Sequence, residues 1–454
     1  MPEFDKLPLL SATIVISFLT ALVVLAIPRD KTIVAKWFAA STSFVTILIS
    51  TYMFVNYDYA KAGFQFVERY PWIESLGVSV HLGIDGISAP MMLLTSIVIF
   101  CGVFASWYVK DRPHEFLFFL FILVSGVFGV FASIDTLVFF FFYELAVIPM
   151  YPLIAVWGST RKEYGAMKLT LYLVAGSVLI WTALLAVYIA SQKYSFDLEV
   201  LQTVVYEPWV QTVFFAFFMV GFGVLGGLWP FHTWSPDGHA AAPTAVSMLH
   251  AGVLMKLGAY GIIRLGMVLL PEGAKFWLPI LIIIATINVV YGAIAAVAQK
   301  DFKYLIGYSS VSHCGYVLMG IGTLTVIGMD GAILQMFSHG IMTALFFLLV
   351  GSVYDSAHTR DLRDFGGIAK AIPIISIFFA IAGLAGLGLP GMSGFVAEFM
   401  VLMGTFQTYP VLGILGIVAV AITAVYVLRM LAKVFFGPLN PKWEKLPDAR
   451  RAEV

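Results

Sequence analysis

The amino-acid sequence predicts an all-α integral membrane protein of the transporter class. Hydrophobic residues make up 61% of its 454 residues and charged residues only 11%, with a mean hydropathy of +0.95. A soluble globular domain is by contrast roughly a quarter charged. Apolar runs of about 20 residues, the length that a helix needs to cross hydrocarbon, recur along almost the whole chain. Glycine and proline interrupt two of these runs, and paired broken helices are typical of transporters.

These runs predict about thirteen transmembrane helices. The spans cover residues 9–27, 37–55, 88–109, 115–133, 135–157, 164–191, 209–235 (broken), 244–269, 275–298, 303–325, 330–354, 371–403 (broken) and 409–436. The first run lacks the basic start and the small-residue cleavage site of a signal peptide, so we expect a retained helix. A longer polar stretch at residues 56–87 predicts a strand or hairpin outside the bilayer.

The stretch from residue 221 to residue 266 carries the first break. It reads GFGVLGGLWPFHTWSPDGHAAAPTAVSMLHAGVLMKLGAYGIIRLG, so glycines and prolines surround a polar core. Proline removes a backbone donor and clashes with the preceding turn, and the helix must therefore break. Non-helical backbone survives at membrane depth only where protein or a water-filled cavity satisfies it. The break is therefore a candidate functional site.

The second break lies in AIAGLAGLGLPGMSGFVAEFMVLMG, where glycines and one proline precede Glu398. The two breaks fall in the seventh and twelfth spans, which are five apart. Because five is odd, a repeat of helices 4–8 in helices 9–13 is inverted in the membrane. The predicted organisation is an N-terminal part with three helices, two inverted five-helix repeats and a cytoplasmic tail, at residues 1–114, 115–270, 271–437 and 438–454.

The distribution of Lys and Arg predicts the orientation. Loops that follow odd-numbered helices, together with the tail, hold seventeen of the 26 basic residues, and the other side holds five. Cytoplasmic loops carry the excess of basic residues. We therefore expect a multi-pass protein of the plasma or inner membrane, with its N-terminus outside and its C-terminus in the cytoplasm.

Charge and cysteine usage argue against other classes of protein. The 26 basic and 26 acidic residues balance to a net charge of zero, so no nucleic-acid partner is indicated. Cys101 and Cys314 lie far apart in apolar segments, too few for a disulfide framework, an iron–sulfur cluster or a zinc site. We expect no cofactor and no metal in this chain.

Four ionisable side chains are predicted at membrane depth. Glu144 lies nine residues after Asp135, hence about 14 Å deep at 1.5 Å per residue. Lys168 enters the next helix from the cytoplasmic side and could pair with Glu144, directly or through water, or reach back to the interface as a snorkelling end residue. Lys256 and Glu398 have largely apolar flanks. As a structural alternative, each of these groups is a hydrogen-bonded polar side chain that stabilises the fold.

Histidines join this set. His313 and His339 fall near the centres of the tenth and eleventh spans, beside several serines, and form either packing residues or a hydrated polar file. His232 and His250 flank the first break, where both interpretations are equally open. Intramembrane chains of carboxylates, ammonium groups and imidazoles mark proton relays, because histidine titrates near neutrality. Four such buried groups cost roughly 10–14 kcal/mol on insertion scales, which a purely structural helix has no reason to retain.

Several runs closely resemble the M-type, antiporter-like membrane subunits of respiratory complex I, the NADH:quinone oxidoreductase. They are YELAVIPMYPL, PFHTWSPDGHAAAPTA, LMKLGAYGIIR, DFKYLIGYSSVSH, FSHGIMTALFFLLVGSVYDSAHTRDL and GLPGMSGFVAEF, within residues 80–435. The resemblance implies that Glu144 and Lys168 are the family's helix-five and helix-six pair, Lys256 its central helix-eight lysine, and His339 and Glu398 its helix-eleven histidine and helix-twelve glutamate. It further implies proton pumping without a cofactor, driven by quinone chemistry elsewhere in the complex, beside other membrane-arm subunits in the bilayer.

The sequence departs from the family pattern at two points. The family usually carries a lysine just before the helix-seven break, where this chain has Leu225. Either His232 or His250 then takes over the proton, or Glu144 pairs only with Lys168 and the subunit conducts poorly. The family also usually has a fourteenth helix, whereas thirteen are predicted here.

Two other functions remain open on the sequence alone. The same motifs occur in subunits of Mrp-type cation/proton antiporters and of membrane-bound hydrogenases. The second alternative is a non-pumping structural spacer of the membrane arm, which Leu225 favours.

Overall fold

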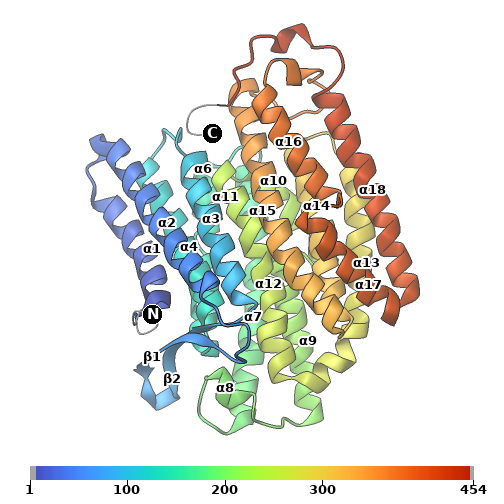
Figure 1. Ribbon diagram of the computed structural model, residues 1–454. Helices are drawn as coiled ribbons and strands as arrows, with labels where there is room; N and C mark the ends of the chain where they lie inside the picture. The colour runs from blue at the N-terminus through green and yellow to red at the C-terminus, as the bar shows by residue number, and fades with distance from the viewer. Residues whose placement is uncertain (1–6, 450–454) are drawn as a thin grey trace.

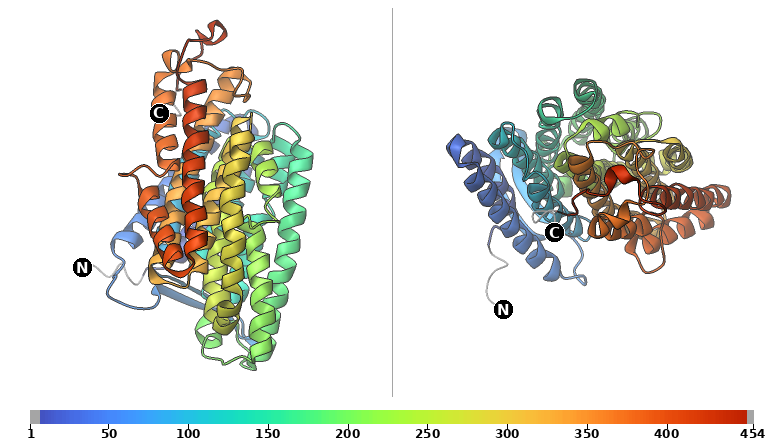
Figure 2. Two further views of the ribbon diagram at one scale, coloured as in Figure 1. Left: turned by 90° about the vertical axis from the view of Figure 1, so that its right-hand side faces the viewer. Right: turned by 90° about the horizontal axis from the view of Figure 1, so that it is seen from above.

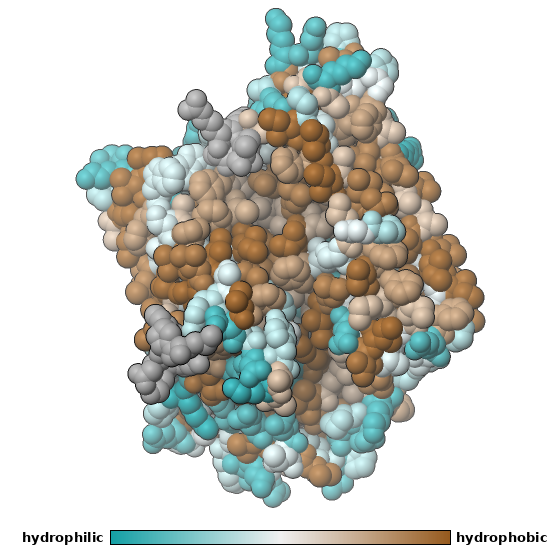
Figure 3. All heavy atoms as spheres, in the orientation of Figure 1, coloured by the Kyte–Doolittle hydropathy of each residue, from teal (hydrophilic) through white to brown (hydrophobic). Residues whose placement is uncertain are grey.

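The computed structural model describes residues 7–449 and is a bundle of long helices lying side by side (Figure 1). Seen from above, the bundle extends from α1 at one edge to α18 at the other (Figure 2). Apolar side chains dominate the middle of the face in Figure 3, and hydrophilic residues gather at its upper and lower ends. This belt is the pattern of a protein whose solvent at mid-height is lipid.

Eleven segments among the described residues are long and apolar enough to cross a membrane. They are α1 (Leu9–Ala26), α2 (Thr32–Val55) with the short η2 (Arg29–Lys31), α3 (Ser88–Ala105), α4 (Pro113–Ala132), α5 (Thr136–Val147) with α6 (Met150–Trp157), α7 (Lys162–Ser191), α9 (Pro208–Leu225), the run Thr244–Met267, α13 (Pro271–Ala298), α15 (Val326–Ala357) and α18 (Pro410–Val434). The multi-pass prediction is confirmed. The two remaining predicted spans correspond to α14 (Phe302–Gly322) and to the pair α16 (Pro373–Gly386) and α17 (Ser393–Thr408).

Both predicted breaks are present. The first separates α9 from α10 (Trp234–Ala241), and residues 226–233 between them form turns. Asn288 of α13 satisfies this irregular backbone: its Nδ2 donates to the carbonyl of Gly227 at 2.7 Å, and its Oδ1 accepts from the N–H of Trp229 at 2.6 Å. The second break, at residues 387–392, separates α16 from α17. Protein groups thus cover backbone that lipid could not.

The predicted eighth span is not one regular helix. It consists of α11 (Thr244–Leu249), the π-helical η4 (His250–Leu254), α12 (Met255–Gly261) and the π-helical η5 (Ile262–Met267). Almost all of its residues are buried, so its sequence shows no polar face whose period could reveal the wider turns. Such π-turns are often found at functional sites.

A β-hairpin and the short helix α8 (Leu198–Leu201) project from the lower end of the bundle in Figure 1. β1 (Gln65–Ile73) pairs antiparallel with β2 (Val78–Ile84), which confirms the hairpin predicted within residues 56–87. The turn between the strands contains η3 (Glu74–Leu76), and near the other end of the bundle lie η6 (Ile368–Lys370) and η7 (Pro441–Trp443).

Two aspartates fasten the hairpin to the helices. Asp135 caps α5 and accepts the N–H of Ser79 on β2 at 3.1 Å. Burial raises the pKa of Asp135 to about 6, against the effect of these backbone donors. Asp197 caps α8 and lies 2.9 Å from Nδ1 of His81. Burial opposes its ionisation too, but the contacts with His81 and Arg69 outweigh burial and lower the pKa of Asp197.

Candidate functional site: a buried file of ionisable side chains

Lys256 lies at the centre of the bundle, 1% exposed. Its position on α12 follows directly after the π-turn η4, and its ammonium donates to the carbonyl of Ala251 in that turn. Its Nζ also lies 2.8 Å from Nδ1 of His339 on α15. The Lys256 ammonium thus contacts one neutral carbonyl and one imidazole. Its hydrogen-bond partners among the described residues include no carboxylate. Such a group can take up and release a proton between partners.

The file continues from His339 to Glu398. The rings of His339 and His313 stack with centroids 5.2 Å apart, and Nδ1 of His313 lies 3.0 Å from Oε1 of Glu398 on α17. Gln335 of α15 donates from Nε2 to the same carboxylate oxygen at 3.2 Å. Lys256, His339, His313 and Glu398 were predicted from the sequence as separate buried groups, and four helices bring them into one connected file.

A glycine in the second break leaves space for the carboxylate of Glu398. Gly388 in that break has a φ of +70°, and a Cβ added there would meet Oε2 of Glu398 at 2.8 Å. The irregular backbone between α16 and α17 therefore lies directly against the end of the file. This contact explains, in steric terms, why a glycine stands at this position.

The direct form of the pairing that the sequence left open between Lys168 and Glu144 is not found, because Lys168 has another partner. Nζ of Lys168 instead lies 2.7 Å from Oδ2 of Asp237 on α10, and the hydroxyl of Tyr304 donates to Oδ1 of the same carboxylate at 3.0 Å. Close packing explains the partner, because a Cβ on Gly165 of α7 would lie 3.1 Å from the carbonyl of Asp237. The signal in the sequence was that Asp237 is the single acidic residue of the stretch 221–266.

Glu144 lies apart from the file. Its neighbours on one face of α5, Phe141 and Ile148, are 49% and 64% exposed, so this part of the helix borders the outer surface of the bundle. Oε1 of Glu144 and the hydroxyl of the adjacent Tyr143 are buried without a hydrogen-bond partner among the described residues. A buried polar atom of this kind implies water or a further protein group.

Three more histidines lie outside the file, on α10, at the start of η4 and in the first break. The rings of His239 and His250 have centroids 4.5 Å apart, and His250 also stacks on Trp234 at 5.0 Å. His232 packs against Tyr291 at 5.0 Å. All six ring nitrogens of these histidines are buried without a partner among the described residues. Since unpaired buried imidazoles are costly, this region is a place for ordered water.

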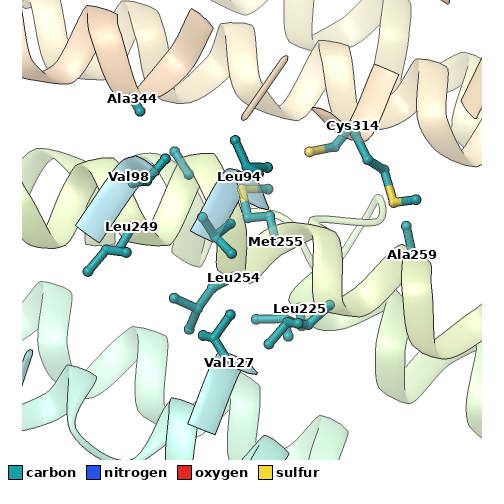
Figure 4. Close-up of a cluster of buried hydrophobic side chains, with 14 of the residues drawn as sticks. Leu94, Val98, Val127, Leu225, Leu249, Leu254, Met255, Ala259, Cys314 and Ala344 are labelled. Atoms are coloured by element: carbon teal, nitrogen blue, oxygen red, sulfur yellow. The ribbon is translucent and has the colours of Figure 1, made fainter. Parts of the chain in front are cut away.

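Leu225 lies in an apolar environment. Figure 4 shows it in the cluster of buried side chains that also contains Val127, Leu254 and Met255. Leu225 itself is fully buried. The position that the resemblance expects to hold a lysine therefore contributes packing here.

One group of side chains outside the file has the spacing of metal ligands. The ligand atoms of His81, Asp197 and Glu199 lie within 4.8 Å of one another. Nη2 of Arg69, however, lies 3.1 Å from the same Asp197 oxygen that contacts His81. Because a guanidinium occupies the position that a cation would take, we assign this group to fastening the hairpin.

The corrected ion pair makes a testable prediction. We expect a double-mutant cycle of Lys168→Met and Asp237→Asn to show a coupling free energy near the lower end of about 1.5–3 kcal/mol, the range for hydrogen bonds to charged groups, because both side chains are about one fifth exposed. Equilibrium unfolding in mixed detergent micelles measures it. The matched cycle of Lys168→Met with Glu144→Gln should show almost no coupling, and the reverse result would restore the predicted pair.

The fold and the file together define a polytopic membrane protein with a proton-relay type of interior. Residues 133–423 match the family model described as NADH:quinone oxidoreductase/Mrp antiporter, TM. The chain belongs to this family of antiporter-like membrane subunits. It is 39% identical over 463 residues to NAD(P)H-quinone oxidoreductase chain 4 of Acaryochloris marina, covering 99% of this chain and 87% of the relative.

Solved structures show the same fold. A chain of respiratory complex I from Thermus thermophilus with bound NADH superposes with a TM-score of 0.91 at 27% identity, covering 98% of this chain and 92% of that chain. A chain of the Mrp complex from Dietzia sp. superposes with a TM-score of 0.86 at 20% identity, over 96% of this chain and 81% of that chain.

Proposed function

We propose that this chain is an M-type, proton-translocating subunit in the membrane arm of a complex I-type NADH:quinone oxidoreductase. The file Lys256–His339–His313–Glu398 carries the proposal, because it joins titratable groups across four helices in the middle of the bundle. In this proposal quinone reduction elsewhere in the complex drives protons along the file, and the chain itself performs no redox chemistry and holds no cofactor. Its partners are the neighbouring membrane-arm subunits.

In this proposal the approach to the file begins in a cavity near the C-terminal end of α10 and the N-terminal end of α14. This cavity of about 190 Å³ is lined by polar groups that include Ser159, Lys303 and Asp355. Nζ of the buried Lys303 donates to the carbonyl of Ala242 at 2.6 Å, just beyond the C-terminal end of α10. A cavity of this size holds several waters. In the proposal, protons enter here and pass the unpaired imidazoles of His239 and His250 to reach Lys256.

The proposed topology has thirteen spans and two inverted repeats. The eleven apolar segments, together with α14 and the pair α16–α17, make thirteen spans, and the breaks at α9–α10 and α16–α17 occupy equivalent places in two inverted repeats. The excess of basic residues at the upper end supports a cytoplasmic C-terminus and an outside N-terminus. The proposed location is the plasma or inner membrane.

Glu144 has a separate role in this proposal. It lies near the surface of the bundle and pairs with no lysine of this chain among its recorded contacts, so we assign it to exchange with a neighbouring subunit or with water. His232 packs against Tyr291 and lies within electrostatic reach of Lys168. We assign His232 and the Lys168–Asp237 pair to proton transfer near the first break.

Two other functions have an observation in their favour. The fold similarity to the Mrp complex, with a TM-score of 0.86, supports a subunit of a cation/proton antiporter. The apolar setting of Leu225 supports a non-pumping spacer of the membrane arm. Identification of the subunits that co-purify with this chain separates the antiporter from complex I.

A pumping assay distinguishes a proton-translocating subunit from a non-pumping spacer. We expect Glu144→Gln to leave the complex assembled and to lower the number of protons translocated per quinone reduced, because the neutral isostere removes a titrating group and little packing. Proteoliposomes with a pH-sensitive dye measure this ratio. An unchanged ratio in the assembled mutant complex would make Glu144 structural, and unchanged ratios for both Glu144→Gln and Lys256→Met would favour the spacer.

A further inference from the structure

A basic cavity lies at the upper end of the N-terminal helices, away from the file. Its volume is about 700 Å³, within the range of small-molecule sites. The loop between α1 and α2 and the loop between α3 and α4 form it, and its lining holds four cationic side chains and one carboxylate, from Arg29, Lys36, Lys110, Arg112 and Glu115. The lining therefore carries a net charge of about +3.

The ion pairs inside this cavity leave the arginines weakly engaged. Oε1 of Glu115 lies 3.5 Å from Nη2 of Arg29 and 3.5 Å from Nε of Arg112. Pairs this long, with guanidinium groups 91% and 55% exposed, contribute little. Two guanidinium groups directed at one carboxylate therefore keep unused donors for another anion.

A buried histidine provides an independent observation. His114 lines the same cavity and is 6% exposed, and its Nε2 has no hydrogen-bond partner among the described residues. An unpaired buried nitrogen costs free energy. A water between this buried nitrogen and a phosphate in the cavity would supply the missing partner.

An aromatic ladder leads from the cavity down the membrane-facing surface of α2 and α3. Lys36, whose Nζ donates to the carbonyl of Trp107 at 2.5 Å, joins the cavity to the top of this ladder. Trp37 packs edge-on against Trp107 with centroids 5.1 Å apart, and Phe104 stacks on Trp107 at 5.5 Å. Phe100 then contacts Phe104 at 5.1 Å. Trp37 is 56% exposed, so the ladder offers a rigid apolar track beside the bilayer.

We propose that this basic cavity and aromatic ladder form a binding site for an anionic phospholipid, with the phosphate headgroup in the cavity and an acyl chain along the ladder. Cationic pockets between transmembrane helices at the basic side of a membrane protein suit such headgroups. The charge, the unpaired His114 and the contiguous apolar track together select a lipid over a free anion. The site does not depend on the proposed transport function.

The test uses the full-length chain, purified in detergent and depleted of lipid. Thermal unfolding is followed by tryptophan fluorescence with added short-chain phosphatidylglycerol, phosphatidylcholine or glycerol phosphate. A ligand that binds only the folded state raises Tm with its concentration. We expect a rise with phosphatidylglycerol and almost none with the other two. Equal shifts with phosphatidylcholine would mean non-specific solvation, and equal shifts with glycerol phosphate would mean an anion site without a lipid.

Variants distinguish binding at this site from diffuse electrostatic attraction by the basic loops as a whole. Arg112→Gln and Lys36→Gln should each lose most of the phosphatidylglycerol-dependent rise in Tm. The matched control is Lys31→Gln, which removes the same charge from an exposed position in η2, close to the cavity in sequence but not part of its lining. Equal loss in Lys31→Gln would overturn the proposal in favour of diffuse attraction, as would a full response in both cavity variants.

Discussion

Replacement of Lys256 by Met is expected to remove this subunit's share of proton translocation while the complex still assembles. Methionine has nearly the same length and is apolar, and it removes a buried ammonium whose insertion costs roughly 2.5–3.5 kcal/mol. Against this gain stands the loss of the 2.8 Å contact with His339 and of the hydrogen bond to the carbonyl of Ala251, each with a net effect of about 1 kcal/mol for a typical hydrogen bond. Stability should therefore be unchanged or slightly higher.

The measurement is the number of protons translocated per quinone reduced in proteoliposomes, together with the amount of assembled complex. Leu257→Met is the matched control, because Leu257 is the next residue on α12 and is fully buried. It should change neither quantity. A Lys256→Met complex that fails to assemble, beside a normal control, would show that Lys256 acts as a structural member of a tight pair.

Much of this architecture could be predicted from the sequence because the bilayer imposes simple rules. Length and hydropathy located the apolar segments, and proline and glycine located both breaks. The buried positions of Lys256, His313, His339 and Glu398 followed from apolar flanks at helical spacing. Their connection into one file did not, because four separate helices contribute these side chains and only tertiary packing decides which of them meet.

The partner of Lys168 illustrates the limit of sequence-based prediction. Depth along a helix is readable from the sequence, and by depth alone Glu144 was a reasonable partner. Rotation about the helix axis is set by packing, and the close approach of α7 to α10 at Gly165 turns Lys168 toward Asp237. The role of Asn288 was missed for the same reason: a single amide in an apolar helix gives no sign that it faces the irregular turn of a distant segment.

The π-turns around Lys256 could not be predicted from the sequence either. A periodic pattern reveals helix geometry only where one face is polar, and the run Thr244–Met267 is buried on all sides except at its two ends. The wider turn η4 carries Ala251, whose carbonyl accepts the Lys256 ammonium. The local departure from α-helix thus supplies one of the two contacts that hold the central lysine.

At the other end of the file, Gly388→Ala is expected to impair transport as strongly as Glu398→Gln does. The new Cβ would meet Oε2 of Glu398 at 2.8 Å, so we expect the carboxylate to shift and to disturb the 3.0 Å contact that its other oxygen, Oε1, makes with His313. Alanine at a φ of +70° also costs about 1 kcal/mol in backbone energy. Pumping in proteoliposomes and Tm of the purified complex measure the two effects separately.

Gly391→Ala separates backbone strain from displacement of the carboxylate. Gly391 lies in the same break with a φ of +102°, but a Cβ there meets nothing within 4 Å. It should lower Tm about as much as Gly388→Ala and leave the protons translocated per quinone reduced almost unchanged. Should the two variants pump equally well, the contact between the break and Glu398 carries no function. Should they pump equally poorly, flexibility of the break, and not the position of the carboxylate, limits transport, because strain is the one change that both share.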